Sequence, residues 1–175
     1  DMIFKDAETG MQMGTGEFGQ AENAVLRCRF LRCSKAGLAT VNFNSMDIWV
    51  WHCRFEDCGY GLYNGAGNFH AYESLFLRSR QMDIGTKNLM VFSFVNNVSI
   101  GSRCFMDWDS QFTWGSPCSI TGNRIIEPTG DFAIRLGNAG PYLVAYIKIK
   151  SRPGKTGPEI IMSWADQVFV GNTYT

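Results

Sequence analysis

The sequence predicts an all-β protein in which short parallel strands wind into a solenoid of about seven coils. A motif of Cys, Phe, Cys and Gly-Leu recurs in the same order in two neighbouring segments, 28–38 and 53–62. Apolar and polar residues alternate along these segments, which is typical of short strands with one buried face. Apolar residues at helical spacing are absent, and Gly or Asn stands at nearly every expected turn.

The tandem motif is the clearest element of the chain. It consists of Cys28, Phe30, Cys33, Gly37 and Leu38 in the first copy and of Cys53, Phe55, Cys58, Gly61 and Leu62 in the second. A single unit of this length has no partner for its backbone groups or its apolar side chains. Successive copies must therefore stack on one another.

Weaker copies of the motif continue on both sides. Segment 74–84 places Ser74, Phe76 and Ser79 at the positions of the first Cys, the Phe and the second Cys. Later copies are predicted at 95–97, 120–123, 146–149 and 169–172. Residues 1–11 overlay 28–38, so we expect the chain to begin inside a coil. An uncapped solenoid of this kind is expected to be a segment of a larger protein, or to have its ends covered by flanking solenoid sequence or a partner chain.

Length and charge agree with a single domain. A chain of 175 residues with a repeat of about 24 has room for about seven coils in one β-helix domain, 1–175. Its 16 basic and 16 acidic residues give no net charge, and no basic cluster offers a nucleic-acid partner an electrostatic footprint. No apolar run approaches the ~18 residues of a membrane span.

Four of the six cysteines belong to the tandem motif, and two states of their thiols are possible. Stacking brings Cys28 to Cys53 and Cys33 to Cys58 with Cα atoms about 5 Å apart, a distance that a disulfide can span. The alternative is two reduced ladders of small apolar side chains, which the serines in the next coil favour. No metal is expected, because the C-x4-C spacing differs from the tight C-x2-C of zinc sites, and no cofactor is indicated.

The coil unit CxFxxCxxxGL at 28–38 and 53–62, with its relatives at 97–102 and 121–125, resembles the right-handed parallel β-helix superfamily, the pectate-lyase-like proteins. The resemblance covers nearly the whole chain and implies a right-handed parallel β-helix. It leaves the substrate open, because this fold hosts lyases, hydrolases, tailspikes and inert scaffolds. The dense calcium-binding carboxylate cluster of pectate lyases and the motifs of polygalacturonases are missing, which disfavours a simple pectinase.

The resemblance implies a substrate groove on the strands that follow each Gly-containing turn. With Leu62, Ile84, Met106 and Ile134 pointing inward, the outward residues include Tyr63, Asp83, Lys87, Phe105, Asp107, Asp109 and Arg135. Asp83 and Asp107 would lie roughly 8 Å apart on sheet geometry, within the window of about 6.5–9.5 Å that inverting glycosidases use.

These residues predict a catalytic face. Asp107 and Asp83 are the expected acid and base, Arg135 and Lys87 would hold anionic groups, and Arg135 would be the base of a lyase. Tyr63 and Phe105 are the expected sugar platforms, Asp109 would lie beside Lys87, and Trp114 in the loop 110–117 would stack on a sugar ring.

A plainer interpretation of this face stays open. Charged residues on an exposed strand are usually a solvated surface, and Lys87 with Asp109 would then be a cross-strand ion pair worth less than about 1 kcal/mol. A register shift of one residue would bury Asp107.

Other aromatic residues are predicted by the same alternation. Trp49 and Trp51 align with His70 and Tyr72 in the next coil, and all four are expected to point inward. His52 is expected to point outward. The loops 110–117 and 151–158, rich in turn formers, are expected to leave the solenoid, where binding residues often concentrate.

The sequence thus favours a carbohydrate-active protein, a polysaccharide hydrolase or lyase that is secreted or at the cell surface. The alternative is a non-catalytic glycan-binding or structural solenoid module of a larger extracellular protein. The partner in either case is a polysaccharide or oligosaccharide.

Overall fold

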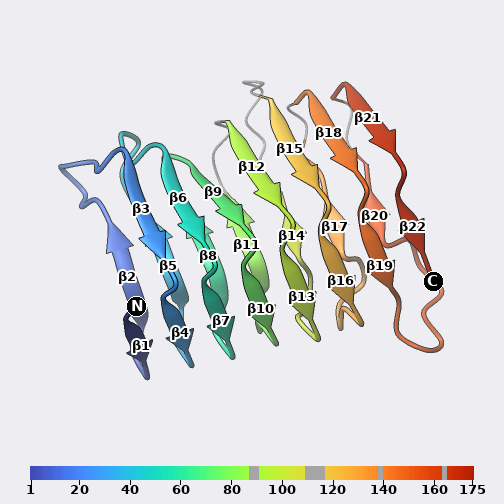
Figure 1. The fold of residues 1–175 in the computed structure, drawn as a ribbon, viewed down its shortest axis with the longest axis horizontal. Helices are drawn as coiled ribbons and strands as arrows, with labels where there is room; N and C mark the ends of the chain where they lie inside the picture. The colour runs from blue at the N-terminus through green and yellow to red at the C-terminus, as the bar shows by residue number, and fades with distance from the viewer. Residues whose placement is uncertain (87–90, 109–116, 138–139, 163–164) are drawn as a thin grey trace.

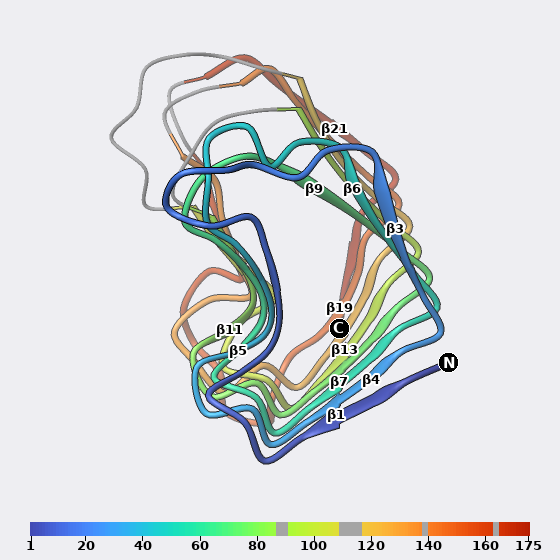
Figure 2. The ribbon, with the colours of Figure 1, turned by 90° about the vertical axis from the view of Figure 1, so that its left-hand side faces the viewer.

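The computed structural model describes residues 1–86, 91–108, 117–137, 140–162 and 165–175. These residues form a parallel β-helix, as predicted, and none of them lies in a helix. Seen from the N-terminal end, the chain turns clockwise as it recedes, so the coil is right-handed (Figure 2). In the same residues, no helix has the length and apolar character needed to cross a membrane.

Three parallel sheets form the walls of the solenoid (Figure 1). In the described part of the chain they hold eight, seven and seven strands, in agreement with the predicted number of coils. Sheet A contains β1 (Ile3–Lys5), β4 (Arg29–Leu31), β7 (Arg54–Glu56), β10 (Leu75–Leu77), β13 (Val98–Ile100), β16 (Arg124–Ile126), β19 (Lys148–Lys150) and β22 (Thr173–Tyr174). Sheet B contains β2 (Thr9–Met13), β5 (Ala36–Thr40), β8 (Tyr60–Asn64), β11 (Met82–Thr86), β14 (Met106–Asp107), β17 (Ile134–Arg135) and β20 (Ile160–Ile161). Sheet C contains β3 (Asn23–Leu26), β6 (Ile48–Trp51), β9 (Phe69–Tyr72), β12 (Phe92–Val95), β15 (Cys118–Thr121), β18 (Tyr142–Ala145) and β21 (Gln167–Val170).

Two corners of the coil bend at a single residue with left-handed backbone. The column between sheets C and A consists of Arg27, His52, Glu73, Asn96, Gly122, Tyr146 and Gly171, and the column between sheets A and B consists of Asp6, Arg32, Asp57, Arg78, Gly101 and Glu127. Apart from Gly171 in the last coil, each donates its backbone N–H to a carbonyl of the next coil. The bend interrupts the period of two, so residues two apart across a corner face opposite sides of the wall. Trp51 and Cys53, on either side of His52, are an example.

The core is a set of stacked columns. Phe4, Phe30, Phe55 and Phe76 form a ladder with ring centroids 5.1, 4.8 and 4.9 Å apart. A Cβ atom at Gly10, Gly37 or Gly61 would come within 2.5–2.8 Å of the ring in the following coil. Glycine is therefore required in the motif because the phenylalanine above it occupies the space of a side chain.

The cysteine columns are ladders of buried free thiols. Cys28, Cys33, Cys53 and Cys58 are unpaired and at most 4% exposed. Burial raises the pKa of Cys53 and of Cys58 to about 11, so both thiols are protonated at neutral pH. The column of Cys28 and Cys53 continues with Ser74, Asn97 and Asn123, whose side chains accept or donate hydrogen bonds between coils. Of the two predicted states, the structure contains the reduced ladders.

Candidate functional site

The outer face of sheet B carries part of the predicted site. Register pairs Tyr63 with Gly85, Gly85 with Asp107, and Asp107 with Arg135, so these residues form one outward column. Tyr63, Asp107 and Arg135 are partly exposed. Their outward placement, with Asp107 beside Gly85, is confirmed.

Asp107 and Arg135 form a closed pair on this face. Arg135 Nε and Nη2 donate to the two carboxylate oxygens of Asp107 at 2.6 and 2.7 Å. The guanidinium also lies 5.0 Å from the centroid of the Phe132 ring. A bidentate pair of this kind engages both oxygens of the expected acid and one edge of the guanidinium that would hold an anionic sugar.

The expectation that Asp83 points outward is wrong. Asp83 and Ile84 are both fully buried, because the start of strand β11 places two successive residues inside. Asp83 occupies the position that Gly37 and Gly61 occupy in the two preceding coils. A Cβ atom added at either glycine would also point into the core. In the coil that follows Asp83, the ladder of phenylalanines ends at Ser99, which is paired with Phe76. The interior space beside this smaller residue holds the carboxyl group.

The surroundings of Asp83 favour its neutral form. Burial raises its pKa to about 7, while the hydroxyls of Ser102, Ser99 and Ser79 favour the charged form and limit the rise. Neither carboxylate oxygen makes a well-aligned hydrogen bond. A carboxyl group enclosed in this way cannot flank a sugar together with Asp107, so the expected acid and base are not brought together.

Phe105 is a second correction. Its side chain is fully buried and meets Phe76 edge-on, with ring centroids 6.3 Å apart. It cannot be a sugar platform, because it closes the end of the phenylalanine ladder. The remaining predicted residues, Lys87, Asp109 and Trp114, lie outside the described residues.

The hollow beside Asp107 is too small for a sugar ring. It has a volume of about 30 Å³ and is lined by Gln81, Met82, Arg103, Cys104, Asp107, Gly130, Asp131 and Phe132. This is roughly the volume of one water molecule in the liquid.

Aromatic side chains instead gather on the outer face of sheet C. Trp49 pairs in register with His70, and Trp51 with Tyr72, as predicted. Trp49, Trp51 and Tyr72 are exposed or partly exposed on the outer side of the sheet, which corrects the expectation that they point inward. His70 lies on the same side but is only 7% exposed. The inward residues of these strands are Ile48, Val50, Phe69 and Ala71, which are fully buried. We call Trp49, Trp51, His70 and Tyr72 the aromatic platform.

The rings of the platform lie next to one another, and His70 is the one that is largely covered. Trp51 and Tyr72 lie 5.2 Å apart, Trp49 and His70 lie 6.3 Å apart, and His70 and Tyr72 lie 6.4 Å apart between centroids. Trp51 is 36% exposed, and Leu26 beside it in the preceding coil is 42% exposed. The strands beneath hold these rings in fixed rows, so they present a preformed apolar surface.

Polar groups stand at the margins of the platform. The Oδ1 atom of Asp47 lies 3.6 Å from Nε2 of His70, and Asn68 donates to the same oxygen at 3.4 Å. Burial lowers the pKa of His70, although Asp47 opposes part of this effect. The imidazole is therefore neutral at pH 7, and it packs against Trp49 and Tyr72 beneath the surface. At the corner, Nδ1 of His52 lies 3.5 Å from Glu73, and His52 is exposed as predicted.

The platform is missed when inward and outward residues are expected to alternate without interruption through the corner between sheets C and A. Alternation from the buried Cys53 would place Trp51 and Trp49 inside. The left-handed backbone of His52 reverses this alternation, so both side chains lie outside. A signal was present in the later coils, where the same corner is occupied by Asn96, Gly122 and Gly171. Asn and Gly are the residues that most readily adopt this backbone conformation.

The chain was also compared with known proteins. No family model, curated protein or solved structure matches it.

Proposed function

We propose that this protein is a non-catalytic glycan-binding solenoid and that the aromatic platform of sheet C is its binding surface. One observation carries the proposal: Trp49, Trp51 and Tyr72 are exposed or partly exposed on the outside of a rigid sheet, with the largely buried ring of His70 against Trp49 and Tyr72. Extended polysaccharides occur mainly outside the cytoplasm, so a secreted or cell-surface location belongs to the same proposal.

The chemistry of the platform suits sugar rings. A pyranose has an apolar face of C–H groups with positive partial charge, which is attracted to the negative face of an aromatic ring. The carboxylates of Asp47 and Glu73 at the margins provide acceptors for hydroxyl groups. A surface with polar margins suits a chain of sugars that lies across the strands. The side chains are already ordered by the strands beneath, which keeps the entropic cost of binding low.

Binding is favoured over hydrolysis or elimination by the state of sheet B. Asp83 is buried, Asp107 is closed in its pair with Arg135, and the hollow beside Asp107 has the volume of about one water molecule. The expected pair, Asp83 and Asp107, therefore cannot flank a glycosidic bond together.

Affinity electrophoresis through gels that contain neutral or acidic polysaccharides tests the proposal. We expect at least one polysaccharide to retard the wild-type protein, and Trp51→Ala to weaken that retardation about tenfold or more. Phe18→Ala removes an aromatic ring that is 71% exposed elsewhere and should leave the retardation unchanged. Equal retardation of wild type, Trp49→Ala and Trp51→Ala would contradict the proposal.

The enzymatic alternative is tested with the same polysaccharides. Assays for new reducing ends and for unsaturated products should be negative. Release of either product by the wild type, with loss of that release in Asp107→Asn, would replace the binding function with a catalytic one.

A further inference from the structure

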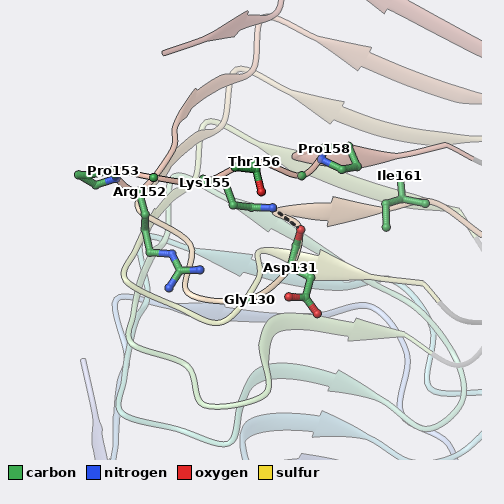
Figure 3. A pocket seen from close by; sticks show the side chains of 10 residues that line it. Gly130, Asp131, Arg152, Pro153, Lys155, Thr156, Pro158 and Ile161 are labelled. Atoms are coloured by element: carbon green, nitrogen blue, oxygen red, sulfur yellow. Dashed lines mark hydrogen bonds between the residues drawn. The ribbon is translucent and has the colours of Figure 1, made fainter.

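A second hollow lies away from the aromatic platform, between two neighbouring coils. It has a volume of about 590 Å³, within the range of about 300–1,000 Å³ typical of small-molecule sites. Gly130 and Asp131, from the turn between β16 and β17, form one side of it. The loop between β19 and β20, residues 152–158, forms the other side (Figure 3).

The loop is held in place by its own backbone and by one side chain. The backbone N–H of Lys155 donates to the carbonyl of Arg152 at 3.2 Å, with Pro153 and Gly154 between them. Gly154 has a φ of 79°, the backbone that a type II turn requires after a proline. The ammonium group of Lys155 donates to the backbone carbonyl of Asp131 at 2.6 Å and so ties the loop to the coil beneath.

Positive charge predominates at this hollow. Arg152 and Lys155 contribute two cations, and Asp131 contributes the single carboxylate of the lining. Within the described residues, neither cation has a carboxylate oxygen within ion-pair distance. In Figure 3 the guanidinium of Arg152 and the carboxyl of Asp131 lie on opposite sides of the space, with Lys155 above them.

We propose that this hollow binds a small ligand that carries a carboxylate or sulfate group together with hydroxyl groups. The planar guanidinium of Arg152 matches an oxyanion with two parallel hydrogen bonds, and Lys155 adds its charge at close range. Asp131, on the other side, accepts hydrogen bonds from the hydroxyl groups of the same ligand. The positive excess of the lining selects an anion, and Asp131 selects against an anion without hydroxyl groups.

Isothermal titration calorimetry at constant ionic strength tests this site. The probes are glucuronate, glucose 6-sulfate and, as a neutral match, glucose. We expect the wild type to bind one or both of the anionic sugars and to bind glucose at least about tenfold more weakly. Binding of glucuronate alone identifies a carboxylate as the ligand group, and binding of glucose 6-sulfate alone identifies a sulfate.

Two matched variants locate the binding. Arg152→Gln removes an exposed charge from the hollow and should weaken binding of the anionic sugar about tenfold. Arg29→Gln removes an exposed arginine from sheet A, away from the hollow, and should change nothing. Failure of the wild type to bind either anion at millimolar concentration, or unchanged binding by Arg152→Gln, would overturn the inference.

The test is independent of the aromatic platform. Trp51→Ala should leave the calorimetric titration unchanged, and Arg152→Gln should leave the retardation by a neutral polysaccharide unchanged. Each site is therefore testable whether or not the other binds.

Discussion

At the scale of the single residue, Asp83 couples the stability of the solenoid to pH. Its carboxyl group is fully buried, and its pKa in the folded protein is about 7 against an ordinary value of 3.8. Well below pH 3.8 the folded and unfolded chains both hold the proton, so the residue has no effect. As pH rises from 4 to 7, the unfolded chain releases the proton and the folded chain keeps it, so stability falls. The total loss is on the order of 4 kcal/mol and is complete above pH 7.

Asp83→Asn should remove this dependence. The amide has nearly the same shape and no charge, so we expect the variant to gain stability relative to the wild type as pH rises from 4 to 8. Urea denaturation at a series of pH values measures the difference, which the carboxylates shared by both proteins do not affect. Asp166→Asn, at an exposed position, serves as the control and should follow the wild type. A constant difference between wild type and Asp83→Asn across this range would show that Asp83 does not titrate as described.

At the scale of the element, the left-handed corners decide which side chains reach the outside. Each corner residue uses its N–H to bond the next coil and reverses the alternation of the strand that follows. A residue with a Cβ atom pays about 1 kcal/mol or more for this conformation, and glycine does not. In the column between sheets C and A, Gly122 and Gly171 take the place of Arg27 and His52 of earlier coils.

Gly122→Ala should destabilise the protein by at least about 1 kcal/mol. Gly122 has a φ of 66°, and an added Cβ atom would also overlap the side-chain oxygen of Asn96 in the preceding coil. Gly16→Ala is the matched control, because no heavy atom lies within 4 Å of its added Cβ. Thermal unfolding of the two variants measures the difference. Equal melting temperatures for both would mean that the corner tolerates a side chain.

The same corners explain which elements were predictable from the sequence. Cys28, Phe30 and Cys33 recur in the next coil with their spacing intact, and such recurrence reveals stacking without any knowledge of the corners. The direction of Trp51 depends on the backbone of one residue, His52, which is a weaker sign of positive φ than the glycine at the same corner in later coils. Asp83 was misplaced for a related reason, because two successive inward residues at the start of a sheet B strand break the period that sequence patterns rely on.

At the scale of the whole molecule, the stack is nearly one-dimensional. Each strand pairs only with its equivalents in the coils before and after it, so every inner coil depends on two neighbours. The aromatic platform lies on β6 and β9. The hollow lined by Asp131, Arg152 and Lys155 lies between the segments that precede β17 and β20. The two proposed sites thus occupy different coils of one rigid support, where local changes at one have no direct contact with the other.

This architecture predicts a gradient of stability along the stack. In the chain 1–175, β1 and β22 each have one neighbour in sheet A, whereas β7 and β10 each have two. Hydrogen exchange should therefore be slowest for amides of the middle coils, such as Arg54 bonded to Cys28 and Leu75 bonded to Cys53. It should be faster for Asp6 in the first coil and Thr173 in the last, although both are hydrogen-bonded between coils. Mass spectrometry of exchanged and proteolysed protein measures the gradient, and the four hydrogen bonds provide matched comparisons. Equal protection from the first coil to the last would mean that the solenoid opens only as a whole, with interfaces between coils strong enough to suppress fraying at the ends.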